Sequence, residues 1–292
     1  MILRRLRNRV FSRLAAFGTL PFVVSVHFET TALCNFKCSM CPVSFQRVER
    51  KEKVLSFDLF KATVDDCETL VTVGLNNWGE PLLHPRITDM VEYASSKMLW
   101  TIFATNASLL TRELSRELIA TGLTNIEFSI DGIGNTYRRI RNAEPESVIN
   151  NIHSFIDENT KKGGAVRTCI VMTVSEQNET EIAEVIEAFK GKVDEVRFQP
   201  CLTFRLYKRR YPCPELTRSH LVVLSDGRVS PCCADFSGSL IVGDVFVDSL
   251  NSIYNGNSMQ HLRKMHKQGQ FEDACGRCSE YESEHAKKRF DG

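Results

Sequence analysis

Short apolar runs alternate with amphipathic stretches along the first 200 residues of this 292-residue chain. Six runs have the length and composition of β-strands: residues 23–30, 70–76, 101–105, 124–131, 167–174 and 194–200. Amphipathic helices fit between them and are expected to start near Ser56, Pro85, Thr111, Pro145 and Asn178. Strands that alternate with helices form parallel sheets with right-handed crossovers. The pattern therefore predicts an α/β fold.

The last three of these strands alternate between apolar and polar side chains. Between residues 126 and 131, for example, Ile126, Phe128 and Ile130 alternate with Glu127, Ser129 and Asp131. Helices must cover the apolar face, so the polar face is expected to point inward. A closed eight-stranded barrel fills its centre with bulky aliphatic side chains. Six strands with a polar interior instead predict a wider, open-sided barrel that lines a substrate cavity.

The pattern changes after Pro200. Residues 201–219 show no helical period, and residues 219–233 predict a β-hairpin that turns at Asp226-Gly227. Two helices are expected near residues 248–254 and 259–267. We therefore predict three parts: an N-terminal helix over 1–22, a barrel over 23–200 and a small α+β module over 201–292.

The N-terminal stretch combines apolar residues at helical spacing with the basic residues Arg4, Arg5, Arg7, Arg9 and Arg13. Such a helix could touch an anionic membrane surface, or could cover the bottom of the barrel with its arginines in water. Gly18 and Pro21 interrupt the apolar run, which argues against a secretory signal. The sequence contains no run of about twenty apolar residues, so no transmembrane helix is predicted.

Composition and charge narrow the class of protein. A net charge of +1 gives no reason to expect a nucleic-acid partner. Eleven cysteines are many for this length, their number is odd, and they cluster near the start and in the last third. Metal ligation in a reducing cytoplasm explains this distribution better than a disulfide framework does.

Cys34, Cys38 and Cys41 form the spacing C-x-x-x-C-x-x-C just after the first predicted strand. Cys38 and Cys41 alone would suit a zinc knuckle or a redox dithiol. Three thiolates on a four-iron cluster leave one iron open to bind a ligand. The segment ETTALCNFKCSMCP resembles the cysteine loop of the radical S-adenosylmethionine (SAM) superfamily. The alternative is three structural or zinc-binding cysteines.

This resemblance implies a partial (β/α)6 TIM-like barrel with a [4Fe–4S] cluster and SAM as cofactors. In that family the open iron binds the amino and carboxylate groups of SAM. An electron from the cluster then splits SAM into methionine and a 5′-deoxyadenosyl radical, which abstracts a hydrogen atom from the substrate. An external reductant such as flavodoxin or ferredoxin would supply the electron.

Three further segments match the family's SAM-binding positions. The segment NNWGEPLLHP over 76–85 resembles the GGEP motif, which places the SAM amino group at Gly79, Glu80 and Pro81. Met40 stands where an aromatic residue near the adenine is usual. The remaining positions, at the ends of two predicted strands, are expected to touch the SAM ribose and carboxylate: Thr105, Asn106, Ser129 and Asp131. The alternatives are a surface turn for 76–85 and strand-end capping for the others.

The C-terminal stretch resembles the SPASM/Twitch extension of radical SAM enzymes, in its shorter Twitch form. That resemblance assigns an auxiliary [4Fe–4S] cluster to Cys213, Cys232, Cys275 and Cys278. Cys233 could replace Cys232, because adjacent residues on a strand point in opposite directions. A structural zinc site is the alternative. The preceding basic segment, residues 205–212, is expected to be a solvated loop, with binding of an anionic group as the alternative.

The remaining cysteines are candidates for a different role. Cys67 lies in a predicted helix and is expected to be a core thiol. Cys169 and Cys201 lie on or beside inward faces, and each of them, or Cys233, could donate a hydrogen atom to a substrate radical.

These features predict an oxidoreductase that acts on a small polar substrate of the sugar, aminocyclitol or nucleoside type. It would oxidise a secondary alcohol to a ketone, with the auxiliary cluster taking an electron. One alternative is a radical epimerase that uses a cysteine as hydrogen donor. Two others are a maturase of peptides or proteins and a metal-binding or electron-transfer module without catalysis.

Overall fold

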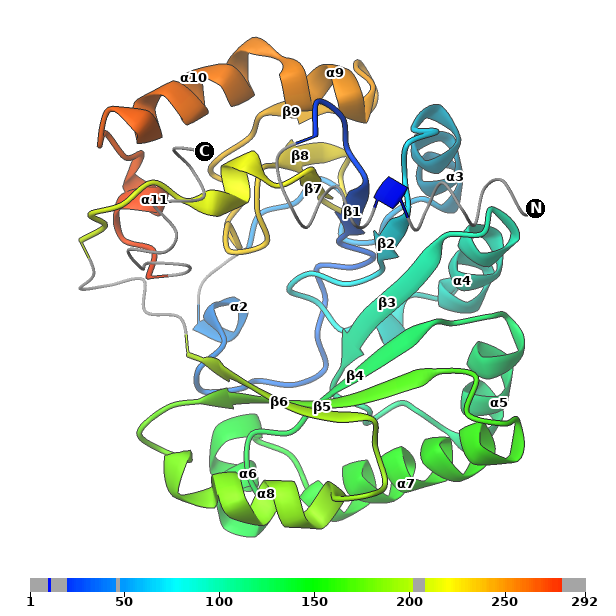
Figure 1. Cartoon of the computed structure of the whole chain (residues 1–292). Coiled ribbons are helices and arrows are strands. Elements are labelled where there is room, and N and C mark those ends of the chain that lie inside the picture. The colour runs from blue at the N-terminus through cyan, green and yellow to red at the C-terminus, as the bar shows by residue number, and fades with distance from the viewer. Residues whose placement is uncertain (1–9, 12–19, 46–47, 202–207, 280–292) are drawn as a thin grey trace. The chain divides into compact units, whose positions relative to one another are not determined.

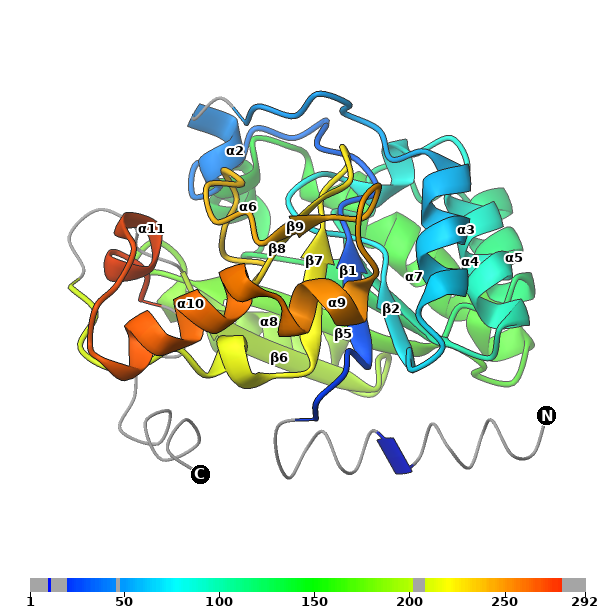
Figure 2. The same ribbon diagram turned by 90° about the horizontal axis from the view of Figure 1, so that it is seen from above.

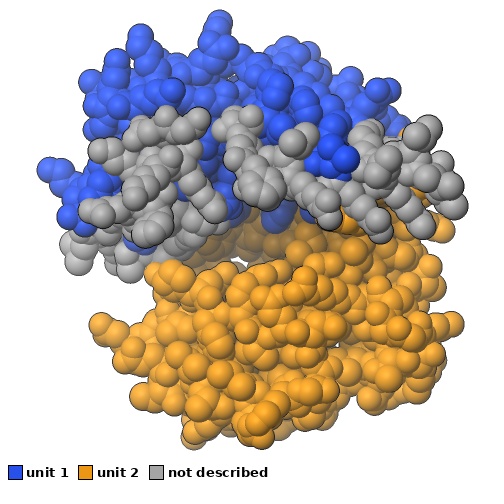
Figure 3. Space-filling view, viewed as in Figure 1, with its two compact units in different colours: residues 1–29, 48–73, 202–292 blue, residues 30–47, 74–201 orange. Residues whose placement is uncertain are grey.

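The chain folds as two units, each of which is built from segments that are not contiguous in sequence. A computed structural model describes residues 10–11, 20–45, 48–201 and 208–279, and Figure 1 shows its elements. Residues 1–29, 48–73 and 202–292 form the first unit, and residues 30–47 and 74–201 form the second (Figure 3). The arginines of the expected N-terminal helix lie outside the described residues. Within the described ranges, no helix is long and apolar enough to cross a membrane.

The second unit is built on four parallel strands in the order β3-β4-β5-β6. Their bounds are Trp100–Thr105 for β3, Asn125–Ser129 for β4, Arg167–Val174 for β5 and Glu195–Pro200 for β6. The short strand β2, Thr72–Gly74, leads from the first unit into the second. Each of these strands occupies a predicted run, so the sequence pattern located them correctly. β2 is shorter than its predicted run, residues 70–76.

Helices cover one face of this sheet (Figure 1). The main ones are α4 Ile87–Ser96, α5 Arg112–Ala120, α6 Gly134–Arg141, α7 Pro145–Lys161 and α8 Ile182–Phe189. The described residues of this unit also form three short helices, α2 Pro42–Phe45, η1 Pro81–Leu83 and η2 Glu179–Glu181. Thr111 caps α5 as predicted, because its hydroxyl accepts a hydrogen bond from the Leu114 amide at 3.2 Å. The prediction missed α6, whose sequence GNTYRRIR has too few apolar residues to show a helical period.

The two faces of β4 and β5 differ as the alternation predicted. Ile126, Phe128 and Ile170 are fully buried, and Phe128 packs edge-on against Phe155 of α7 at 5.6 Å between ring centroids. On the opposite face Glu127 is only partly buried and pairs with Arg197 of β6 at 2.7 Å, and Gln199 of β6 donates to Thr173 of β5 at 3.1 Å. The edge strand β6 departs from the pattern, since Phe198 on its apolar face is 36% exposed.

The first unit contains the start of the chain and its last third. Strand β1, Ser25–Phe28, pairs in parallel with β7, His220–Val223. An antiparallel hairpin joins β7 to β8, Arg228–Ser230, and β8 pairs with β9, Gly243–Asp244. The hairpin turns at Asp226-Gly227 as predicted, and Gly227 has φ +87°, a conformation that glycine adopts without strain.

The helices of the first unit are α3 Phe57–Asp66, η3 Pro214–Thr217, α9 Leu250–Asn255, α10 Asn257–Lys267 and α11 Asp273–Gly276. Helices α9 and α10 follow each other directly (Figure 2), close to the two helices predicted there. Helix α3 begins after Ser56 as expected and ends at Asp66, but the Ser56 side chain makes no capping hydrogen bond.

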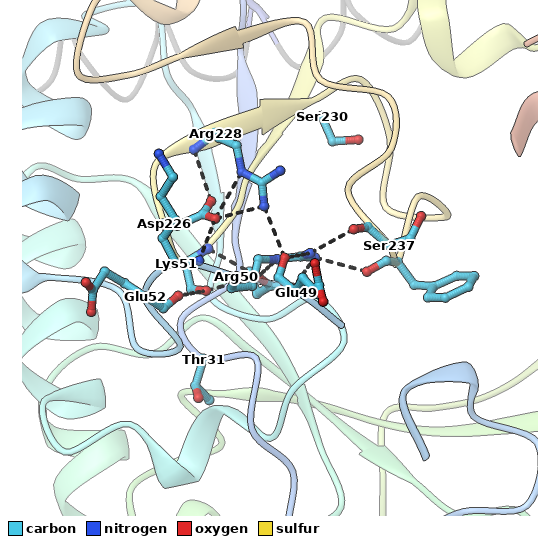
Figure 4. Close-up of polar contacts among 12 residues, drawn as sticks. Thr31, Glu49, Arg50, Lys51, Glu52, Asp226, Arg228, Ser230 and Ser237 are labelled. Carbon is cyan, nitrogen blue, oxygen red and sulfur yellow. Dashed lines mark hydrogen bonds and ion pairs between the residues drawn. The ribbon is translucent and has the colours of Figure 1, made fainter. Parts of the chain in front are cut away.

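A buried ion pair joins three segments of the first unit. Arg50 donates to both carboxylate oxygens of Glu29, at 2.7 and 3.1 Å, and both side chains are fully buried. The same guanidinium donates to the carbonyls of Phe236 and Ser237 at 3.0 Å, and Figure 4 shows Arg50 directed at Ser237. Desolvating two charges is costly, and a bidentate pair with further hydrogen bonds offsets that cost. Arg50 therefore holds residues 48–53 against the end of β1 and the loop after β8.

The ion-pair cluster between α5 and α7 predicts a pH-dependent stability. Glu158 of α7 accepts hydrogen bonds from Arg112 and Arg116 of α5 and from Lys161. The bonds from Arg116 and Lys161 lower the pKa of Glu158 from 4.5 to about 2. A lowered carboxyl pKa stabilises the folded state above pH 4.5, and this stabilisation is lost as the pH falls towards 2.

We therefore expect the Glu158→Gln variant to be less stable than wild type at pH 7, with a much smaller difference at pH 3. Urea unfolding at the two pH values measures this. The matched control is Glu187→Gln, which breaks only the exposed pair with Lys190 and should change stability little at either pH. A Glu158→Gln difference that is the same at pH 3 and pH 7 would contradict the assignment.

Candidate functional site

The three cysteines of the first motif lie in one loop of the second unit, between β1 and α2. All three are free thiols; Cys38 is buried, and Cys34 and Cys41 are half-buried. The amide of Cys41 donates to the carbonyl of Cys38 at 3.1 Å, and the amide of Ser39 donates to the carbonyl of Ile140 at 2.8 Å. The loop is therefore closed by a turn and docked on the last residues of α6.

The environment of these thiols suits a cationic partner. Burial, followed by the carboxyl of Glu80 and the other two thiols, raises the pKa of Cys34 to about 11. Burial also raises the pKa of Cys38 and of Cys41, although Arg141 opposes the shift in both. Without a cation the thiols therefore stay protonated. Iron ions held among three soft sulfur donors would favour the thiolates, so the donor set fits an iron–sulfur cluster.

Gly79 allows the backbone after β2 to touch the segment just before Cys34. A Cβ atom at Gly79 would overlap the carbonyl of Thr31 and lie 2.8 Å from the carbonyl oxygen of Leu33. The next amide, that of Glu80, donates to the same Leu33 carbonyl at 2.8 Å. Only glycine permits this close approach of the two backbones. Gly79 therefore lets the loop after β2 pack against the residues that lead into the cysteine loop.

The carboxylate of Glu80 joins the loop after β2 to the end of β3. It is buried and accepts hydrogen bonds from the hydroxyl of Thr105 at 2.6 Å, the amide of Asn106 at 2.8 Å and the amide of Leu82 at 3.1 Å. Burial raises the pKa of Glu80, and these three bonds oppose the shift. Pro81 begins η1 at the position where its missing N–H costs nothing.

Asn106 connects the end of β3 to the cysteine loop. Its side-chain amide donates to Asn35, the neighbour of Cys34, at 3.0 Å, and its oxygen accepts from the amide and the hydroxyl of Ser108. Asn35 in turn donates to Ser108 at 2.8 Å. These bonds agree with the structural alternative for Asn106. Asn35 was not predicted from the sequence, where the position of Asn35 next to Cys34 is the only indication of its role.

Asp131 and Arg141 form the charged pair beside Cys38. The Arg141 Nε lies 2.5 Å from an Asp131 oxygen, and the second Asp131 oxygen accepts from the Thr173 amide at 2.7 Å. The Arg141 Nη1 lies 4.0 Å from the sulfur of Cys38. Arg141 is a site residue that the sequence analysis missed, because it lies on the unpredicted helix α6.

The other predicted cofactor contacts lie near this loop or at the strand ends. Ser129 is half-buried at the end of β4 and makes no side-chain hydrogen bond to the described residues. Met40 is half-buried within the cysteine loop.

The structure separates the candidate hydrogen donors. Cys201 directly follows β6, and burial, followed by Asp131 and Cys41, raises its pKa, so Cys201 lies within reach of the charges around the cysteine loop. Cys169 lies four residues before Thr173 on β5, about 13 Å along the strand. After burial, the charges that affect the pKa of Cys169 are those of the Arg197–Glu127 pair and its neighbours. Cys233 belongs to the first unit.

The first unit brings together the predicted auxiliary ligands. Cys213, Cys275 and Cys278 are buried, and burial, followed by Cys233, Cys213 and Cys275, raises the pKa of Cys232 well above its ordinary value. The pKa of Cys275 is likewise raised by burial and by the neighbouring thiols of Cys213 and Cys278. Four soft donors in one neighbourhood fit an iron–sulfur cluster, and Cys233 lies close enough to Cys232 to remain an alternative. Within the described ranges, no three His, Cys, Asp or Glu side chains converge to hold a single metal ion.

Arg209 and His266 hold the backbone of these cysteines. Arg209 is 4% exposed and donates to the carbonyls of Cys275 at 3.1 Å and Cys278 at 3.2 Å. The Cys213 amide donates to His266 Nδ1 at 3.1 Å. The expectation of a solvated basic loop is therefore wrong for Arg209, whose guanidinium replaces water with carbonyl oxygens. His266 was missed by the sequence analysis.

Two protein-family models match parts of this chain. The model of a family described as the radical SAM superfamily matches residues 28–189, and that of an iron–sulfur cluster-binding domain, SPASM, matches residues 213–279. A Pyrococcus furiosus protein, the tungsten-containing aldehyde ferredoxin oxidoreductase cofactor-modifying protein, is 35% identical over 109 residues, or 36% of this chain and 30% of that protein. The chain spans 30–40% of the length of the first curated relatives that it matches.

Two solved structures show the fold. The crystal structure of BtrN in complex with AdoMet and 2-DOIA has a TM-score of 0.62 at 18% identity, and the match covers 89% of this chain and 94% of that chain. Streptococcus suis SuiB bound to precursor peptide SuiA has a TM-score of 0.67 at 13% identity, with coverage of 87% and 69%. The predicted partial TIM-like barrel with a small C-terminal domain is thereby confirmed.

The close approach at Gly79 predicts that a single methyl group there is harmful. We expect the Gly79→Ala variant to be destabilised by about 1–3 kcal/mol, because the loop before Cys34 must move away. Iron bound per chain should fall as well. Urea unfolding and iron analysis measure these two effects. The control is Gly276→Ala, whose Cβ would meet only Phe271 at 3.8 Å; equal stability of the two variants would contradict the prediction.

The buried guanidinium of Arg209 predicts a similar effect in the first unit. The Arg209→Met variant keeps a long side chain but leaves the carbonyls of Cys275 and Cys278 without their charged donor. We expect a loss of about 3 kcal/mol in the free energy of unfolding and less iron per chain. The neighbouring Arg210 is exposed, so Arg210→Met should change stability by less than about 0.5 kcal/mol. A result in which both variants match wild type would rule out this role for Arg209.

Proposed function

Because this chain belongs to the radical SAM superfamily, we propose that it oxidises a secondary alcohol of a small polar substrate to a ketone, with the auxiliary cluster accepting an electron. The family model covers residues 28–189, more than half of the chain. The cofactors of this protein are a [4Fe–4S] cluster and SAM, together with auxiliary iron–sulfur clusters in the SPASM domain. The substrate would be of the sugar, aminocyclitol or nucleoside type.

The observation that carries this proposal is the polar inner face of β4–β6. Glu127, Arg197, Thr173 and Gln199 line it with charge and hydrogen-bonding groups, and Ser129 adds a hydroxyl with no side-chain partner among the described residues. A hydroxyl-rich substrate needs such groups to replace its water. BtrN, which has the same fold, was crystallised in complex with AdoMet and 2-DOIA.

The residues around the first cluster have separate tasks in this proposal. Cys34, Cys38 and Cys41 would hold the cluster, which with bound SAM would supply a 5′-deoxyadenosyl radical for abstraction of a hydrogen atom. Gly79, Glu80 and Pro81 offer backbone and carboxylate acceptors to the SAM amino group. In this proposal Thr105, Asn106, Ser129 and Asp131 would contact the SAM ribose and carboxylate, and Met40 would contact the adenine.

The second unit also supports a task for Arg141. Its guanidinium is the half-buried cation next to Cys38, and the thiolates of a loaded cluster would add negative charge there. Arg141 thus offsets charge on the cluster side, while Asp131 fixes its orientation. Loss of Arg141 would leave Asp131 buried without its cation.

Two observations favour other reactions of the same class. Cys201 lies within reach of the charges around the cysteine loop, which favours an epimerase in which this thiol returns a hydrogen atom to the substrate. SuiB has the same fold and was crystallised bound to precursor peptide SuiA, which favours peptide modification. Cys169 and Cys233 are weaker hydrogen-donor candidates. A metal-binding or electron-transfer module without catalysis is the last alternative.

Iron analysis and SAM cleavage test the proposed function. After anaerobic reconstitution, wild type should hold about eight irons per chain, and each of two variants about four. The variants replace Cys34, Cys38 and Cys41, or Cys213, Cys275 and Cys278, by alanine. With SAM and dithionite, wild type and the second variant should release 5′-deoxyadenosine, and the first variant should not. Zinc in place of iron, or no 5′-deoxyadenosine from wild type, would overturn the proposal.

The same reaction in deuterated water separates the alternatives. Candidate sugars and aminocyclitols are added, and the product is analysed by mass. A ketone without solvent deuterium at the reacting carbon supports dehydrogenation. Solvent deuterium fixed at that carbon means epimerisation and excludes the proposed oxidation.

A further inference from the structure

Tyr137 carries a buried hydroxyl that forms no hydrogen bond with the described residues. The residue lies on α6, its side chain is fully buried, and its oxygen makes no hydrogen bond to the described residues. Leaving a buried hydroxyl unsatisfied costs about 1–3 kcal/mol, which is why most buried tyrosines bond to something. Phenylalanine would fill the same space without that cost. The hydroxyl therefore points to a ligand that the chain binds.

The surroundings of Tyr137 identify where that ligand lies. Tyr137 and Arg141 are four residues apart and share a face of α6. Arg141 pairs with Asp131 and lies 4.0 Å from the sulfur of Cys38, and the carbonyl of Ile140 holds the cysteine loop through Ser39. Burial raises the pKa of Tyr137, and the charges that also affect this pKa are those of Arg141, Cys38, Asp131 and Glu80. The hydroxyl thus lies among the groups around the cysteine loop.

The groups around the Tyr137 hydroxyl leave it one role, that of a hydrogen-bond donor. Asp131 already accepts from Arg141 and the Thr173 amide, and Glu80 accepts three hydrogen bonds. The phenol keeps its proton in this setting, so it acts as a donor. The acceptor it lacks is a negatively charged atom delivered when the site is loaded.

We propose that Tyr137 donates a hydrogen bond to the anionic assembly bound at Cys34, Cys38 and Cys41, either to a sulfur of the cluster or to the carboxylate of SAM. This inference rests on the proposed function. A bond to a sulfur would stabilise the reduced, more negative cluster and raise its reduction potential. A bond to the carboxylate would tighten SAM binding without changing the potential of the SAM-free cluster. Tyr137 is thus a positioning residue for the cofactors.

The test compares Tyr137→Phe with Tyr254→Phe in the reconstituted full-length protein. Tyr254 is an equally buried tyrosine of the first unit whose hydroxyl donates to the Thr217 carbonyl at 3.4 Å. Iron per chain, the reduction potential from EPR-monitored titration without SAM, and the SAM dissociation constant from calorimetry are measured. Tyr137→Phe should show either a lower potential or SAM binding weaker by about tenfold. Tyr254→Phe should show neither.

The unloaded chain provides a second measurement. Without iron and SAM, Tyr137→Phe should be as stable as wild type or more stable, because it removes an unsatisfied hydroxyl. Tyr254→Phe should be less stable, because it removes a satisfied one. A Tyr137→Phe protein that loads iron fully, with unchanged potential and SAM affinity, would overturn the inference and leave the proposed function intact. Failure of wild type to load iron at Cys34, Cys38 and Cys41 would overturn both.

Discussion

The buried carboxylate of Glu80 is the constraint on which the first cysteine site depends. Its three hydrogen bonds hold the end of β3, the start of η1 and its own loop in one arrangement. That arrangement brings Gly79 against Thr31, and the cysteine loop follows from this contact. The loop is closed by its own turn from Cys38 to Cys41 and is held from outside where the Ser39 amide donates to the carbonyl of Ile140. A carboxylate suits this task because it can accept several hydrogen bonds in a small space, which offsets the cost of its burial.

Charge balance is the second feature of this site. Cys34, Cys38, Cys41, Glu80 and Asp131 all become negative when ionised, and Arg141 is the cation that shares their surroundings. Empty, the site lowers its charge by keeping the thiols protonated. When the site is loaded, the iron cations would instead favour the thiolates. The donors Arg141 and Tyr137 would then face the negative charge of the cluster and SAM. Binding of the cluster and release of thiol protons are therefore coupled.

The two cysteine sites are held by different means. In the second unit, the loop is held by its contacts with strand ends and with α6. In the first unit, Arg209 and His266 bond directly to the backbone of Cys213, Cys275 and Cys278. The first arrangement surrounds the cysteines with polar groups that could meet a cofactor such as SAM. The second commits its buried polar groups to the backbone, as expected for a cluster whose ligands are all protein thiolates.

The sequence by itself determined the parallel strands, most helix starts, the hairpin at Asp226-Gly227 and the two cysteine sets. Those features depend on local spacing or on the side chain's own chemistry, which a single chain displays. Only the tertiary structure decided the roles of Asn35, Arg141, Arg209, His266 and Tyr137, and separated Cys201 from Cys169. Each of these acts through partners far away in sequence or through burial. A helix such as α6, with little apolar periodicity, is stabilised by packing rather than by its own pattern, so its functional residues have no local signal.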